Sequence, residues 1–180
     1  SVEKFATLFY GVFDSKSRSL EYTNAGHNFP IHWSPNRDCL FLKEGGLVIG
    51  VLKDAPYQSA KIQLLPGELL VFYTDGVTEA RDKKEDEFGE ARLIDVISRC
   101  SHKPAESILE TILDSVTVFT DGDLESDALT LVYRGPIPQR SGLTEGRSTL
   151  PEQVPQIKLP VLIMAGNGGR RGIPRPTIMN

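Results

Sequence analysis

The stretch that decides the fold of this chain is Leu69-Leu-Val-Phe-Tyr-Thr-Asp-Gly-Val-Thr-Glu-Ala80, an apolar run that ends in an aspartate and a glycine. Five consecutive apolar or aromatic residues, Leu69 to Tyr73, are typical of a strand buried on both faces, and the turn pair Pro66-Gly67 precedes them. A carboxylate at the tip of such a strand is costly to desolvate unless something pairs with it. We therefore expect Asp75 to lie at the mouth of the sheet and to hold a cation or a hydrogen-bond donor.

A second interpretation of the same pair is open. Asp-Gly is most often found in a β-hairpin turn, and on spacing alone Asp75-Gly76 fits that use. The choice between a turn and a ligand depends on the sequence around the pair.

The composition is that of one ordinary globular domain. A length of 180 residues allows a sizeable core, and the net charge of −4 gives no reason to expect nucleic acid as a partner. Two cysteines, Cys39 and Cys100, are too few for a disulfide framework and lack metal-ligand spacing. No apolar run approaches the ~18 residues that span a bilayer, so we expect no membrane contact from this chain and a cytoplasmic location.

The order of expected elements indicates an α+β fold. Strands are expected at residues 6–13, 20–23, 31–33, 39–42, 59–64 and 69–73, with antiparallel pairing throughout. Helical apolar spacing follows at 91–100 and 104–119, and a last strand is expected at 129–133. Strands, then helices, then one returning strand indicate helices packed on one face of a sheet.

The chain changes character after residue 134. Prolines and glycines crowd residues 135–160 and no periodicity remains. We expect one folded domain at residues 1–134, with its N-terminal part missing, and a basic, disordered tail or linker at 135–180. A strand of a following domain at 159–164 is the alternative.

Several separate motifs occur in a recognisable order. They are Phe5-Ala-Thr-Leu-Phe-Tyr-Gly-Val-Phe-Asp14, Leu20-Glu-Tyr-Thr-Asn-Ala-Gly-His-Asn28, Gly45-Gly-Leu-Val-Ile-Gly50, the Thr-Asp-Gly of the opening stretch, Glu87-Phe-Gly-Glu-Ala-Arg-Leu93 and Ser126-Asp-Ala-Leu-Thr-Leu-Val132. Together they resemble the bacterial PP2C-type (PPM) metal-dependent serine phosphatases, in the sporulation stage II E and sigma-factor-regulator branch. The resemblance covers residues 5 to about 134.

This resemblance implies an αββα sandwich of antiparallel sheets flanked by helices. It also implies an absence, because the family's Asp-x-x-Gly-His-Gly motif, whose Asp bridges two metal ions, is not found in the chain. By position the motif would lie upstream of Ser1, so we expect an active parent, with a sensory domain upstream, of which this chain alone is an impaired part.

The resemblance also assigns metal ligands. Phosphoester hydrolysis is served by paired divalent cations that activate water, and Mg²⁺ or Mn²⁺ choose carboxylates, which leaves zinc disfavoured here. In the family, the matches to Asp75 (with Gly76 beside it) and to Asp127 bind one ion. Ala128 replaces the second aspartate of the family's Asp-Asp-x-Thr pattern, a change that would remove a supporting hydrogen bond and spare the ligand. The alternative for Asp127 is a turn before the last strand.

Four further residues are candidates for the cleft: Asn24, His27, Gly45 and Gly46. His27 could donate a proton to the leaving serine, but a structural histidine in an Asn/Gly turn is the favoured interpretation. Gly45 and Gly46 do not open a helix, so a loop that lines the cleft fits them better than a phosphate cradle.

Three functions are therefore considered. The first is a phosphatase that hydrolyses phosphoserine or phosphothreonine on a regulatory protein, an anti-sigma-factor antagonist being the expected substrate. The second is a pseudo-phosphatase that binds a phosphoprotein without cleaving it, and the third is an interaction domain that shares only the fold. We favour the first.

Overall fold

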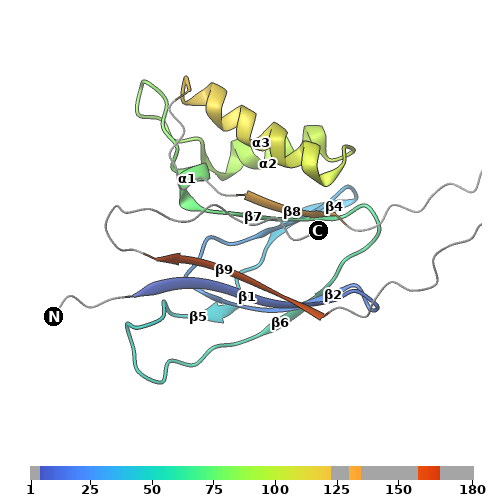
Figure 1. Ribbon diagram of the computed structural model, residues 1–180, viewed down its shortest axis with the longest axis vertical. Coiled ribbons are helices and arrows are strands. Elements are labelled where there is room, and N and C mark those ends of the chain that lie inside the picture. The colour runs from blue at the N-terminus through green and yellow to red at the C-terminus, as the bar shows by residue number, and fades with distance from the viewer. Residues whose placement is uncertain (1–4, 123–129, 135–157, 167–180) are drawn as a thin grey trace, which may run out of the picture.

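The computed structural model describes residues 5–122, 130–134 and 158–166. They form two stacked β-sheets with helices over one of them (Figure 1). The elements in chain order are β1 (Ala6–Asp14), β2 (Ser19–Ala25), β3 (Ile31–Ser34), β4 (Arg37–Phe41), β5 (Gly45–Gly46), β6 (Ala60–Gln63), β7 (Leu69–Tyr73), α1 (Asp75–Thr78), α2 (Gly89–Cys100), α3 (Ala105–Phe119), β8 (Thr130–Arg134) and β9 (Lys158–Gly166). No helix within these ranges has the length and apolar character that a membrane span requires.

One sheet has four strands in the order β4-β3-β7-β8, and the other has five, with β5-β2-β1-β9 in line and β6 on the same side of β2 as β5. Every pairing is antiparallel except that of β2 with β5. The expectation of antiparallel pairing throughout is therefore wrong at this pair. The chain crosses between the two sheets after β4, so no hairpin dictates the direction in which β5 arrives.

β7 is buried along its whole length, as the apolar run predicted. Alternate side chains of a strand point to opposite faces. Accordingly Leu69, Val71 and Tyr73 belong to the core beneath the helices, whereas Leu70 and Phe72 belong to the core between the sheets. Each core therefore takes one face of the same strand.

The two long helices bury their apolar stripes against the four-stranded sheet. Ile97 of α2 and Ile108, Ile112 and Val116 of α3 are fully buried in the core that contains Val71. Figure 1 shows both helices on one side of the stacked sheets. Within the described ranges no helix covers the far face of the five-stranded sheet, so three layers of the expected αββα sandwich are present.

β9 lies within the segment that we expected to be a tail. It pairs antiparallel with β1 over residues 158–166 (Figure 1). The other residues of 135–180 lie outside the described part of the chain.

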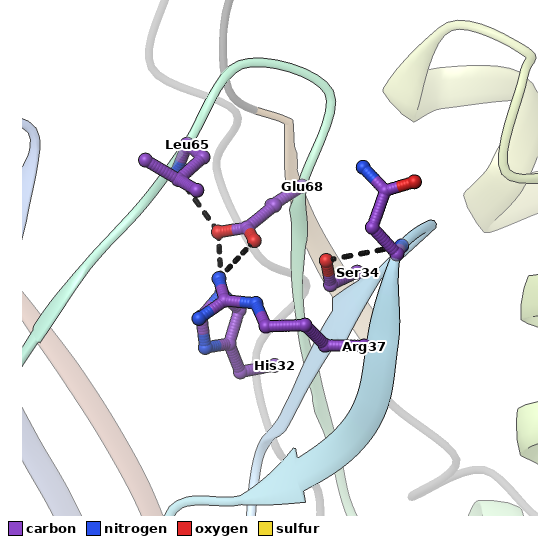
Figure 2. Close-up of polar contacts among 6 residues, drawn as sticks. His32, Ser34, Arg37, Leu65 and Glu68 are labelled. Carbon is purple, nitrogen blue, oxygen red and sulfur yellow. Dashed lines mark hydrogen bonds and ion pairs between the residues drawn. The ribbon is translucent and has the colours of Figure 1, made fainter.

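Glu68 comes directly before β7 and is a carboxylate buried at 2% exposure. Figure 2 shows it between three segments: Oε2 accepts hydrogen bonds from the Leu65 backbone N–H (2.8 Å) and from His32 Nε2 (2.8 Å), and Oε1 pairs with the Arg37 guanidinium. Burial raises the pKa of Glu68, but hydrogen bonds from Leu65, Arg37, His32 and Ser34 outweigh it and lower the pKa from 4.5 to about 2. The ionised carboxylate thus joins β3 and β4 to the turn before β7.

The lowered pKa predicts acid sensitivity. Because the pKa is depressed in the folded chain, the stabilisation is complete above pH 4.5 and is lost as the pH falls toward 2. It amounts to about 3 kcal/mol. Glu68→Gln has no carboxylate at this position, so the pH-dependent stabilisation should be absent. In urea unfolding between pH 4.5 and 2, the free energy of unfolding of this variant should fall less steeply with pH than that of the unchanged chain.

Glu110→Gln, on the exposed side of α3, is the matched control and should follow the unchanged chain. Parallel acid profiles for Glu68→Gln and the unchanged chain would contradict the assignment.

Candidate functional site

Asp75 stands where β7 ends and α1 begins. The Glu79 backbone N–H donates to the Asp75 carbonyl at 2.7 Å, and the Val77 N–H donates to the Thr74 carbonyl at 3.1 Å. The chain therefore enters a helical turn after β7, and Asp75-Gly76 does not form the hairpin turn that was the alternative interpretation.

The Asp75 side chain is exposed although its neighbours Gly76, Val77 and Thr78 are buried. Its Oδ1 accepts a hydrogen bond from the Gly76 backbone N–H at 3.0 Å. Among the described residues it forms no ion pair. A carboxylate held this way, at the end of a fully buried strand, presents oxygen ligands from a rigid support.

An open pocket of about 700 Å³ lies beside Asp75, between α1, the following loop and the end of α3. Its two basic side chains are already paired: Lys83 with Asp121, and Arg81 with Glu85 at 3.3 Å. The charges left for a ligand in the described lining are therefore mainly carboxylates, which suit a cation better than a free anion.

Asn24 and His27 form a tight turn at the end of β2. The Asn24 Oδ1 accepts the His27 backbone N–H at 2.8 Å, and its Nδ2 donates to the His27 carbonyl at 3.0 Å. Gly26 between them has a φ of +73°, and a Cβ there would lie 2.4 Å from Cγ2 of Val48. The Asn-Ala-Gly-His sequence thus has a structural reason, in keeping with the favoured interpretation.

The His27 ring is buried beside Thr7. It is 4% exposed, and its Nδ1 lies 3.3 Å from Thr7 Oγ1. Burial lowers the pKa of His27, and the Asp75 carboxylate opposes that shift. The end of β2 in one sheet and the end of β7 in the other are therefore electrostatically coupled.

Gly45 and Gly46 allow β5 to approach this turn. A Cβ on Gly45 would lie 1.8 Å from the Asn24 carbonyl oxygen, and one on Gly46 would lie 2.5 Å from the Pro56 carbonyl oxygen. Both obstacles are backbone, which cannot move aside. The two glycines serve close packing beside the Asn24–His27 turn, and neither begins a helix.

The remaining predicted ligand, Asp127, lies outside the described residues, so its role stays a prediction. The part of the chain that the structure describes holds no group of three or more metal-binding side chains. Neither Glu68 nor His32 was predicted from the sequence to belong to a polar cluster. The available signal for Glu68 was its position, because it is a charged residue between the Pro66-Gly67 turn and the buried run that begins at Leu69.

The close approach at Gly45 predicts a strong effect of one added methyl group. Gly45→Ala should destabilise the chain by more than about 3 kcal/mol, or prevent folding, because the clash is with backbone. Thermal unfolding would measure the change.

Gly67→Ala is the control. A Cβ added to Gly67 would meet nothing within 4 Å, and the residue has a φ of +85°, so the change should cost only about 1 kcal/mol. Equal effects at both glycines would show that β5 does not need the close approach.

The chain is similar to known proteins over most of its length. The model of the family described as Stage II sporulation protein E (SpoIIE) matches residues 1–136. Over 132 residues the chain is 33% identical to Protein IcfG of Synechocystis sp. (strain ATCC 27184 / PCC 6803 / Kazusa) and 30% identical to phosphoserine phosphatase RsbU of Bacillus subtilis (strain 168). Each alignment covers 72% of this chain, but 21% of IcfG and 39% of RsbU. The chain thus spans less than half the length of these relatives.

A solved structure shares the fold. The PP2C phosphatase domain of the cell fate determinant SpoIIE from Bacillus subtilis, solved with a fragment of its regulatory domain, matches with a TM-score of 0.57 at 19% identity. The match covers 69% of this chain and 37% of that one. The PP2C-like architecture of stacked sheets with flanking helices, predicted from the sequence, is confirmed.

Proposed function

We propose that this chain, which belongs to the stage II sporulation protein E (SpoIIE) family, is part of a metal-dependent protein phosphatase domain. The observation that carries the proposal is Asp75, an exposed carboxylate at the end of a strand buried on both faces. The proposed reaction is the hydrolysis of phosphoserine or phosphothreonine on a regulatory protein. The relative named phosphoserine phosphatase RsbU is in keeping with this reaction. The substrate that we favour is an anti-sigma-factor antagonist, which the motif resemblance implies.

The residues present fit Mn²⁺ or Mg²⁺. These ions prefer carboxylate oxygens and keep several water molecules, so a site with few protein ligands suits them. Asp75 would hold the ion, with Gly76 beside it and Asp127 as the second proposed carboxylate. A bound divalent ion would activate water and neutralise phosphoryl oxygens.

The chain itself supplies the position of that ligand. The backbone before Asp75 is held in the middle of the four-stranded sheet by β3 and β8. The Tyr73 hydroxyl, two residues earlier, donates to Glu90 Oε1 of α2 at 3.0 Å. These contacts hold the carboxylate at the mouth of the pocket, where a phosphorylated side chain of a protein substrate would enter.

A non-catalytic phosphoprotein-binding module is the second candidate. One observation favours it: Ala128 occupies the place of an aspartate in the family pattern. Such a module would keep the fold and the pocket without turnover.

The phosphatase proposal predicts that Asp75→Asn abolishes metal-dependent turnover. Phosphate release from a phosphoserine peptide by the complete domain, which includes the upstream motif, should fall by more than about 100-fold with Mn²⁺, because the variant loses a charged ligand. Calorimetry should show weaker Mn²⁺ binding at the same time. Asp114→Asn, on the exposed side of α3, should change neither quantity.

The outcomes separate the two candidates. Undiminished release by Asp75→Asn would rule out the proposed site. Phosphopeptide binding by the complete domain with no release would favour the binding module.

A further inference from the structure

One nitrogen of the buried His27 ring is not accounted for by the fold. Nδ1 lies 3.3 Å from Thr7 Oγ1, but Nε2 is buried and has no hydrogen-bond partner among the described residues. An unsatisfied buried polar atom costs about 1–3 kcal/mol. Such an atom in a well-packed turn points to a partner outside the described part of the chain, such as a water molecule.

The position of this nitrogen is set by the structure around it. Asn24 hydrogen-bonds both the N–H and the carbonyl of His27, and β5 packs against Asn24 through Gly45. Thr7, from the neighbouring strand β1, contacts the ring itself. The ring therefore has little freedom to turn and find another partner.

Asp75 follows the strand that packs on this turn: the Phe72 ring, three residues before Asp75, lies edge-on to Phe9 with ring centroids 5.4 Å apart, and Phe9 pairs with Asn24. Its carboxylate acts on the His27 ring electrostatically, yet Nε2 forms no hydrogen bond with it. A gap too long for a direct hydrogen bond and short enough for electrostatic coupling is commonly bridged by water.

We propose that His27 is a positioning residue of the Asp75 site. In this arrangement Nδ1–H donates to Thr7 Oγ1, and the Nε2 lone pair accepts a hydrogen bond from a water molecule in the hydration shell of a divalent cation held by Asp75. The inference rests on the proposed metal site. It assigns His27 a role other than the proton donor considered from the sequence, since a neutral ring with Nε2 unprotonated has no proton to give there.

The chain has a natural comparison for this histidine. His32 is also buried with one ring nitrogen, Nδ1, lacking a described partner, but its other nitrogen donates to Glu68 at the opposite end of β7. His102 is exposed. With three histidines in the chain, His32 and His102 serve as internal controls.

The test is Mg²⁺ titration of the ¹⁵N-labelled chain, followed by long-range ¹H–¹⁵N spectra of the imidazole rings. We expect His27 to carry its proton on Nδ1 and its Nε2 resonance to shift on addition of Mg²⁺. The resonances of His32 and His102 should stay in place. No shift should occur at His27 in Asp75→Asn.

Calorimetry gives a second measurement. His27→Ala should weaken Mg²⁺ binding about 10-fold, the effect typical of losing a group that supports a metal site. His27→Gln should recover part of the affinity because its amide oxygen can accept the same hydrogen bond. His102→Gln should bind as the unchanged chain does.

Mg²⁺ binding that depends on Asp75 but leaves the His27 Nε2 resonance unmoved would overturn this inference and leave the proposed function standing. Conversely, a Mg²⁺-dependent shift at His27, together with no phosphate release by the complete domain that includes the upstream motif, would support this inference and contradict the proposed function. Mg²⁺ binding that does not depend on Asp75, or no binding, would overturn both.

Discussion

The burial of β7 on both faces is the constraint on which the rest of the structure depends. Its five side chains alternate between the core under the helices and the core between the sheets. A strand of this kind has no side on which a polar side chain meets water. Charged residues can therefore be placed only at its two ends, and the chain places one carboxylate at each, Glu68 before the strand and Asp75 after it.

The two carboxylates are treated in opposite ways. Glu68 is enclosed and fully paired, with Leu65, His32 and Arg37 supplying the hydrogen bonds that keep it ionised. Removing one partner of such a buried group leaves the others uncompensated, so the cluster acts as a structural joint. Asp75 is exposed, and within the described residues it forms no ion pair. One end of the strand thus holds the fold together, and the other is available to a ligand.

Stacking of the two sheets brings the second part of the site to Asp75. β2 belongs to the other sheet, and its Asn24–His27 turn ends where the charge of Asp75 reaches the imidazole. The parallel approach of β5, possible because Gly45 lacks a side chain, packs against the back of this turn. Hydrogen bonds of the Asn24 side chain hold this turn, and the His27 ring keeps one nitrogen that has no partner among the described residues.

The sequence by itself determined β7, the two long helices and the position of Asp75. These depend on local patterns: an unbroken apolar run for β7, helical spacing for α2 and α3, and an aspartate shortly after the run. The order of its motifs also identified the family. Tertiary structure decided the parallel β2–β5 pair, the Glu68 cluster and the coupling of His27 to Asp75. Glu68 meets His32 across 36 positions of the chain, and the charge of Asp75, which follows β7 of one sheet, acts on His27, which follows β2 of the other. No local period encodes such contacts, since they arise from how the two sheets pack on each other.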